Sequence, residues 1–233
     1  MSAPIYQTLG NHVVRPLLHL LFRPERDGWE NVPAEGPAIL CSNHESIVDP
    51  FILGMTTHRV IHYMAKAELF GQPVLKQVMI GSGVFPVERG AADGRALAHG
   101  RELLERGELI GIFPQGTCLP YRIRPYRRGA ARLALETGTP IVPVCMIGTE
   151  RILRPGKPKL GLPKVRIRAA PPIEVERADP TPDAAAALTA RVERTIEELR
   201  GDYVPQHVWR EGEFRPKTRR LRCARGSKQS EYR

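Results

Sequence analysis

Short apolar runs and longer helical stretches alternate along this chain of 233 residues, and that alternation limits its fold class. Each apolar run has the length of a buried strand. The six runs are Ala38–Cys41, Val60–Met64, Gly83–Val87, Leu109–Phe113, Ile141–Ile147 and Lys164–Ala169. Between several of them, the residue pattern predicts helices over Arg95–Arg106 and Arg128–Thr137, and a glycine that suits a helix end follows each.

A third predicted helix lies nearer the carboxyl end of the chain. Thr181 can cap it, and Pro182 suits its first position. Apolar residues recur at helical spacing before Gly201, at Leu188, Val192, Ile196 and Leu199. Strands that alternate with helices predict a single α/β domain, with a largely parallel sheet flanked by helices. Ligands of such sheets bind beyond the carboxyl ends of the strands, so residues just after each strand are functional candidates.

One histidine and one aspartate follow the first predicted strand, in Asn43-His44-Glu45-Ser46-Ile47-Val48-Asp49-Pro50. An imidazole at this position can take up a proton, while a carboxylate holds its other nitrogen and stabilises the cation that forms. A substrate that supplies its own hydroxyl needs no serine or cysteine nucleophile. His44 and Asp49 therefore suggest group transfer onto an alcohol. The alternative is an ordinary hydrogen bond within a loop, without chemistry.

Cations and a glycine loop follow other predicted strands. Lys66 comes just after the second strand and Arg89 just after the third. The fourth strand leads into Pro114-Gln115-Gly116-Thr117, a loop that can expose backbone N–H groups. Together these groups suit an anion such as phosphate. Taken singly, each can also be a solvated surface cation or an ordinary turn.

The positive charge of the chain is unevenly distributed. Six of the ten net charges lie between Arg210 and Arg233, where nine Lys or Arg stand against three Glu. This composition predicts a mobile tail, either solvated or lying on a polyanionic surface such as anionic lipid. Nucleic acid is disfavoured as a partner, because the chain lacks the aromatic clusters and motifs of proteins that bind it.

The four cysteines form no C-x-x-C pair and have no histidine at metal-ligand spacing. This pattern predicts a reduced, cytosolic compartment and supports neither a metal site nor a disulfide framework.

The amino-terminal segment Ile5–Phe22 predicts an amphipathic helix. Arg15, Pro16 and His19 interrupt its apolar residues, so it is too short and too polar to cross a bilayer. It can lie in a membrane interface with its cations toward lipid phosphates, or it can pack on the domain. Pro16 should kink it in either case. The predicted division is an amphipathic helix over 1–24, a domain over 25–205 and the basic tail over 206–233.

Four sequence blocks follow one another along the chain: N-H-x-S-x-x-D, F-x-x-x-R, F-P-x-G-T and I-V-P-V. They resemble the motifs of the glycerolipid acyltransferases, and more narrowly those of the bacterial 1-acylglycerol-3-phosphate acyltransferases. The resemblance covers about residues 35–150. It implies transfer of a fatty acyl group from an acyl thioester, carried on coenzyme A or acyl carrier protein, to the free hydroxyl of a lysophospholipid. The implied acceptor is 1-acylglycerol 3-phosphate, which would give phosphatidic acid.

The resemblance also implies roles for individual residues. His44 would be the general base toward the acceptor hydroxyl, and Asp49 its orienting partner. Lys66 and Arg89 would hold the acceptor phosphate. Val142 and the proline after it would belong to the block associated with the acyl donor. The family further implies a membrane-associated amino-terminal region, no bound cofactor or metal, and a peripheral or monotopic protein at the cytoplasmic face of the membrane.

The third block departs from the family's usual wording, F-P-E-G-T-R-S. Gln115 puts an amide where the family has a carboxylate, and Cys118 replaces an arginine that could bind phosphate. Gln115, Gly116 and Thr117 would still line the acceptor site. Four arginines just after the loop could take over phosphate binding: Arg122, Arg124, Arg127 and Arg128. The departures leave two alternatives open, a catalytically weakened lipid-binding relative and an acyltransferase for a different lysolipid.

Overall fold

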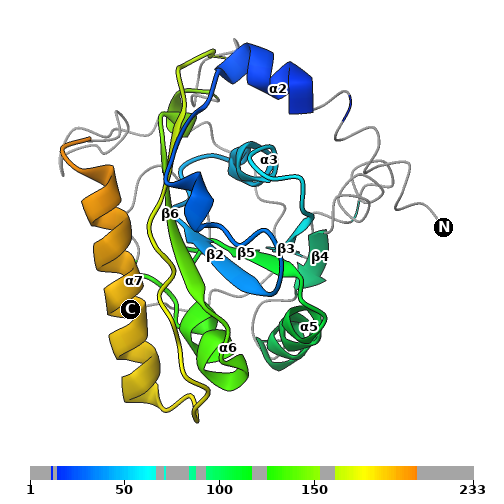
Figure 1. Ribbon diagram of the computed structural model, residues 1–233, viewed down its shortest axis with the longest axis vertical. Coiled ribbons are helices and arrows are strands. Elements are labelled where there is room, and N and C mark those ends of the chain that lie inside the picture. The colour runs from blue at the N-terminus through cyan, green and yellow to red at the C-terminus, as the bar shows by residue number, and fades with distance from the viewer. Residues whose placement is uncertain are drawn as a thin grey trace, which may run out of the picture.

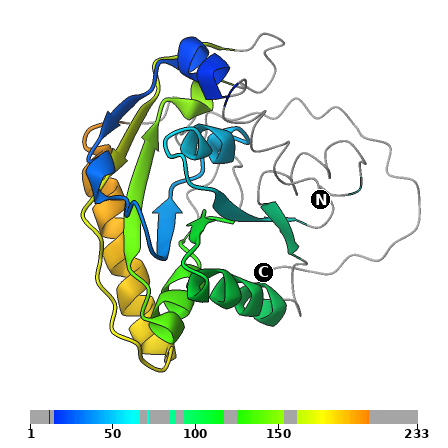
Figure 2. The same ribbon diagram turned by 45° about the vertical axis from the view of Figure 1, so that its right-hand side comes forward.

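A computed structural model describes residues 12, 15–66, 71, 84–87, 93–116, 125–152 and 161–203. Its centre is a seven-stranded sheet in the order β1-β7-β6-β2-β5-β3-β4, with helices on both faces (Figure 1, Figure 2). The strands are β1 (Glu25–Asp27), β2 (Ala38–Ser42), β3 (Ile61–Lys66), β4 (Val84–Val87), β5 (Leu109–Ile112), β6 (Ile141–Ile147) and β7 (Arg166–Ala169). The helices are α2 (Arg15–Phe22), α3 (Asp49–Gly54), α5 (Asp93–Glu105), α6 (Gly129–Thr137) and α7 (Pro182–Arg200), with short 3-10 turns η2 (Trp29–Asn31) and η4 (Thr149–Arg151).

Every pairing within the sheet is parallel except that of β6 with β7, which is antiparallel. The predicted α/β domain with a largely parallel sheet is therefore confirmed. The strand β2 lies between β5 and β6, with Cys41 opposite both Ile112 and Pro143. Because parallel strands end at the same edge, the segments that follow β2, β5 and β6 meet there.

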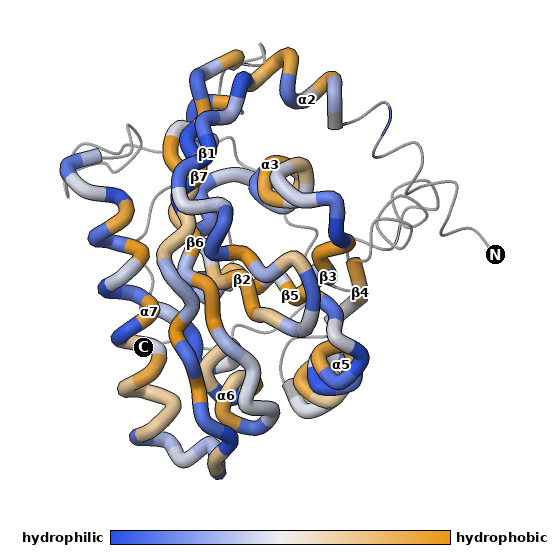
Figure 3. Tube along the Cα trace, in the orientation of Figure 1, coloured by the Kyte–Doolittle hydropathy of each residue, from blue (hydrophilic) through white to orange (hydrophobic). Residues whose placement is uncertain are grey.

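Alternate residues of β2 enter two separate hydrophobic cores. Ala38 and Leu40 join the core that includes α3, whereas Ile39 and Cys41 join the core that includes α5, α6 and α7. The period of two follows from the pleat of a strand, and burial on both faces explains why the run is apolar throughout. Figure 3 shows the matching pattern on the outer layer, where α5 and α7 each carry a hydrophobic and a hydrophilic side.

The predicted helix ends are confirmed at the residues that the sequence singled out. Gly138 follows α6 in the left-handed conformation, with φ of 69°, which a residue with a Cβ adopts at a cost. The Thr181 hydroxyl accepts a hydrogen bond of 3.2 Å from the Ala184 N–H and so caps α7. The predicted apolar stripe of α7 packs into the core, with Val192 and Ile196 fully buried.

Besides the two short 3-10 turns, one strand and one helix were not predicted from the sequence. The strand β1 is three charged residues long and has no apolar alternation. It forms because it lies parallel to β7 at the edge of the sheet, where one side of a strand can stay solvated. The helix α3 begins at Asp49, within a segment that the sequence predicts only as a loop.

The described part of the predicted amino-terminal helix is α2. Its Phe22 is buried in the core with α3, and Nε2 of His19 lies 3.2 Å from the carbonyl oxygen of Met55. Leu17 and Leu20 remain exposed, so α2 packs on the domain by one side only. Pro16 is the second described residue of α2, and residues 13 and 14, where the predicted kink would show, lie outside the described residues. Among the described residues, no helix has the length and apolar character needed to cross a membrane.

Candidate active site

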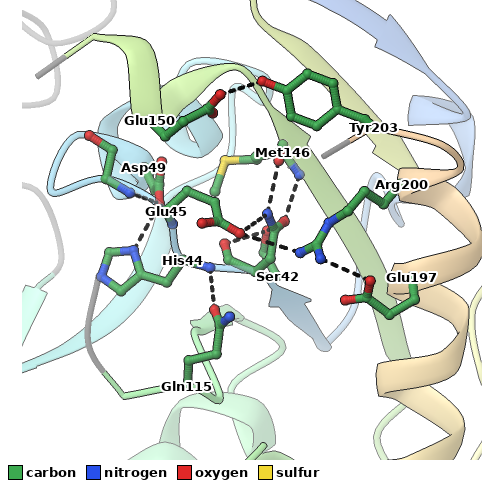
Figure 4. A network of polar contacts seen from close by, with 12 residues as sticks. Ser42, His44, Glu45, Asp49, Gln115, Met146, Glu150, Glu197, Arg200 and Tyr203 are labelled. Atoms are coloured by element: carbon green, nitrogen blue, oxygen red, sulfur yellow. Dashed lines mark hydrogen bonds and ion pairs between the residues drawn. The ribbon is translucent and has the colours of Figure 1, made fainter. Parts of the chain in front are cut away.

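The segment between β2 and α3 brings the predicted histidine and aspartate into contact (Figure 4). Nδ1 of His44 lies 2.9 Å from Oδ2 of Asp49. The aspartate side chain is fully buried, and 14% of the histidine side chain is exposed. A carboxylate that accepts a hydrogen bond from Nδ1 selects the tautomer in which Nδ1 carries the proton and Nε2 does not. The second ring nitrogen is then suited to accept a proton.

Asp49 is held by its own loop. Its Oδ2 also accepts hydrogen bonds from the backbone N–H groups of Glu45, at 2.7 Å, and Ser46, at 2.8 Å. These contacts form because the chain turns back on itself, with the Asp49 N–H donating to the Ser46 carbonyl at 3.1 Å. The spacing of His44 and Asp49 in the sequence is the spacing of this turn. The carboxylate therefore keeps one position relative to the imidazole.

Two aromatic rings lie against the imidazole. The Phe113 ring stacks on His44, with centroids 4.4 Å apart and planes 24° apart, and Tyr63 lies 5.9 Å beyond Phe113. Burial, together with the negative charge of Asp49, raises the pKa of the Tyr63 hydroxyl well above its ordinary value. The tyrosine is therefore neutral, and the two rings form an apolar wall that fixes the plane of the imidazole.

The loop after β5 contacts the histidine through Gln115. Its Oε1 accepts a hydrogen bond of 2.5 Å from the backbone N–H of His44. The next residue, Gly116, has φ of +71°, a conformation that favours glycine. A Cβ on Gly116 would lie 3.1 Å from Nε of Arg127, so the guanidinium of Arg127 lies against this loop. The Arg127 N–H also donates to the Pro114 carbonyl at 3.0 Å.

The remaining predicted site residues are described only in part. Lys66 is the last residue of β3, with its backbone opposite Val87 of β4. Arg89 and Thr117 lie outside the described residues, as do Cys118, Arg122 and Arg124. Val142 and the proline after it lie in β6 beside β2, and Val142 is fully buried.

A second polar network lies behind the histidine and was not predicted from the sequence (Figure 4). The side-chain amide of Asn43 pairs with the backbone of Met146, donating to its carbonyl at 2.9 Å and accepting from its N–H at 2.7 Å. Oε1 of Glu45 lies 3.3 Å from Nη2 of Arg200, the last residue of α7. Asn43 and Glu45 belong to the motif and could have been suspected. Arg200 lies 155 positions away from Glu45 and carries no local signal.

The buried cysteines are unsuited to nucleophilic chemistry. Burial raises the pKa of the thiols of Cys41 and Cys145 to about 12 in each case, which keeps them protonated near neutral pH. Within the ranges described, no three His, Cys, Asp or Glu side chains form a group that could hold a metal ion.

The sequence is similar to those of known acyltransferases. The family model described as Acyltransferase matches residues 23–147. A 1-acyl-sn-glycerol-3-phosphate acyltransferase of Bacillus subtilis is 31% identical over 175 residues, which cover 73% of this chain and 84% of that protein. A chloroplastic 1-acyl-sn-glycerol-3-phosphate acyltransferase of Brassica napus is 30% identical over 169 residues, which cover 70% of this chain and 48% of that protein. The chain thus spans about half the length of such plant relatives.

A solved structure has the same fold. The crystal structure of the 1-acyl-sn-glycerophosphate acyltransferase PlsC from Thermotoga maritima matches with a TM-score of 0.64. The match covers 87% of this chain and 81% of that chain, at 20% sequence identity.

Proposed function

Because the chain belongs to the acyltransferase family, we propose that it transfers a fatty acyl group from an acyl thioester to the free hydroxyl of a lysophospholipid. The proposed acceptor is 1-acylglycerol 3-phosphate, the substrate in the names of the relatives from Bacillus subtilis and Brassica napus. The product would be phosphatidic acid. The observation that carries the proposal is the contact between Nδ1 of His44 and the buried Asp49.

In the proposed mechanism, Nε2 of His44 removes the proton from the acceptor hydroxyl as its oxygen attacks the thioester carbonyl. Asp49 stabilises the imidazolium that forms. The tetrahedral oxyanion then collapses, the carbon–sulfur bond breaks, and the imidazolium returns its proton to the leaving thiolate. A positioned base contributes roughly 10²–10⁴-fold to such a rate, and positioning of the two substrates contributes the rest.

We propose that the cations that follow the strands bind the phosphate of the acceptor. Lys66 and Arg89 remain the proposed ligands, with Gly116 and Thr117 lining the same site. Arg127 is proposed as a third cation, because its guanidinium lies against Gly116 and the arginine expected at position 118 is a cysteine. A guanidinium offers paired donors that match phosphate geometry. The donor is a thioester of coenzyme A or of acyl carrier protein.

We also propose that the protein works at the cytoplasmic face of a membrane, as a peripheral or monotopic protein. The exposed apolar side chains of the described residues support this placement. Leu17 and Leu20 are on α2, Ile47 is in the loop that carries His44, and Phe51 is on α3. In this proposal residues 25–205 carry the activity, and the helix over 1–24 and the tail over 206–233 contact the anionic surface.

The activity is tested with purified protein, a labelled acyl thioester and a panel of lysolipids, and the products are identified by mass spectrometry. We expect His44→Ala to reduce transfer by at least about 10²-fold, because the base is lost. His58→Ala, at an exposed position before β3, is the matched control and should keep full activity. Full activity of folded His44→Ala protein would contradict the proposed mechanism.

A second candidate function rests on Gln115, which replaces the carboxylate of the family motif. A weakened relative would bind lysophospholipid in the same site without efficient turnover. Saturable binding of 1-acylglycerol 3-phosphate, with no product from any thioester or lysolipid tested, would favour that reading over the enzyme.

A further inference from the structure

The last turn of α7 lies against the loop that carries His44, from the face of the sheet opposite to α3 (Figure 4). Three contacts fix it there. Nη1 of Arg168 in β7 donates to the Leu199 carbonyl at 2.8 Å. Arg200 pairs with Glu45, and the Tyr203 hydroxyl donates to Glu150 just after β6. Residues 199–203 themselves lie beyond residues 23–147, the part of the chain that matches the family.

Glu45 connects α7 to the histidine. Its backbone N–H donates to Oδ2 of Asp49, the same oxygen that contacts His44. Its carboxylate turns to the other face of the sheet, where it contacts Arg200 and accepts from the side-chain amide of Asn43 at 3.4 Å. Glu45 therefore holds Asp49 through its backbone N–H, and the Glu45 side chain is itself held by Arg200 and Asn43.

The ion pair is partly desolvated. Only 12% of the Glu45 side chain and 17% of the Arg200 side chain are exposed. Arg200 also pairs with Glu197 at 2.8 Å, one turn earlier in α7. Charges this far from water interact more strongly than surface charges and are poorly screened by salt. The pair therefore fixes the position of Glu45 and balances its negative charge.

We propose that Arg200 is a positioning residue for the proton transfer at His44, and that it acts through Glu45. This inference rests on the proposed function and deepens it, because it adds α7 to the machinery of the reaction. Among the described residues, charged side chains in contact with the histidine loop or with its partners include Asp49 from α3, Glu45 from the loop itself, and Arg200 with Glu197 from α7.

Kinetics of four variants test the coupling. We expect Arg200→Gln to lower kcat by about 10- to 100-fold with little change in the KM for the acyl thioester, since a displaced base loses rate rather than donor binding. Glu45→Gln should lower kcat similarly. The kcat of the double variant Glu45→Gln/Arg200→Gln should fall no further than that of the worse single variant, because both changes break the same ion pair. Arg194→Gln, an exposed arginine on the same helix, is the matched control and should be unaffected.

The pKa of the His44 imidazole provides a readout that needs no activity. It can be followed by NMR, with the resonance assigned by its loss in His44→Gln. Removing the cation at Arg200 leaves Glu45 unbalanced, which favours the imidazolium and raises the pKa by about 0.5. Removing the carboxylate with Glu45→Gln has the opposite sign and lowers it. Arg200→Lys, which keeps the charge, should return the pKa toward its original value.

Opposite shifts in the two single variants support the inference, since loss of stability alone would not give them. Unchanged imidazole pKa values in folded Arg200→Gln and Glu45→Gln protein would overturn it. A kcat for Arg200→Gln within twofold of the unmodified protein would also overturn it, as would a double variant that loses the product of the two single effects. If the unmodified protein transfers no acyl group, the proposed function fails, and the NMR titration still decides the role of Arg200.

Discussion

His44 is fixed on every side that the structure describes. Asp49 holds Nδ1, Phe113 stacks on the ring, and Gln115 accepts from the backbone N–H. The contact gives Gln115 a structural role toward His44, separate from the substrate binding proposed for it. An amide oxygen and a carboxylate oxygen can both accept this hydrogen bond, so the change from the family's glutamate keeps the contact and removes one negative charge.

We therefore predict that Gln115→Leu lowers kcat by about 10-fold, because the His44 N–H loses its acceptor and the imidazole moves. Gln115→Glu is the matched variant and should keep kcat within a few-fold. Its added negative charge favours the imidazolium, so the acidic limb of the kcat/KM profile should move to higher pH. Measuring kcat and the pH profile for both variants checks this. Equal activity of Gln115→Leu and the unmodified protein would rule out this role for the amide.

At the scale of the elements, the packing of β5 beside β3 requires a glycine at position 111. A Cβ on Gly111 would overlap the ring of Tyr63 on the neighbouring strand β3, the ring that supports Phe113 and, through it, His44. The sequence shows only a glycine within an apolar run. Its purpose depends on which strand lies beside β5, and that neighbour is fixed by the sheet order rather than by adjacent residues.

We predict that Gly111→Ala destabilises the protein by about 1–3 kcal/mol, since the added methyl forces the Tyr63 ring out of its place. Gly129→Ala is the control. It lies at the first residue of α6, where a Cβ would meet nothing within 4 Å, so alanine should be tolerated there without loss of stability. Urea unfolding should therefore show a lower midpoint for Gly111→Ala and no decrease for Gly129→Ala. A Gly111→Ala midpoint at or above that of the unmodified protein would contradict the packing argument.

At the scale of the whole molecule, the structural features that could be predicted from the sequence are those that depend on periodicity and on interactions between residues close in the chain. The buried runs and the capped helices were confirmed because each is encoded within ten to twenty consecutive residues, as Thr181 and Gly138 illustrate. The His44–Asp49 contact could be anticipated because a single turn brings the two residues together. Arg200 and Tyr63 could not be anticipated, since only the order of the strands and the crossing of α7 bring them near the histidine.

The exposed leucines of α2 lead to a prediction about the intact protein. We expect Leu17→Gln/Leu20→Gln to weaken binding to vesicles that contain anionic phosphatidylglycerol, because each buried leucine contributes about 1.5–3 kcal/mol when it leaves water. Ala190→Gln, exposed on α7 across the sheet, is the control. Co-sedimentation with vesicles measures the change. Unaltered binding of the double variant, with the fold intact, would place the membrane contact elsewhere on the molecule.

The Asn43 side chain occupies the place where the next peptide group of β2 would otherwise pair with β6. It offers one donor and one acceptor in a single plane, so Met146 keeps both backbone hydrogen bonds after the main chain of β2 has left the sheet. Hydrolytic deamidation of this asparagine would put a carboxylate oxygen in place of the N–H that donates to the Met146 carbonyl, so two acceptors would face each other. That repulsion would act one residue before His44, so the loss of a single amide group would disturb the loop that carries the imidazole.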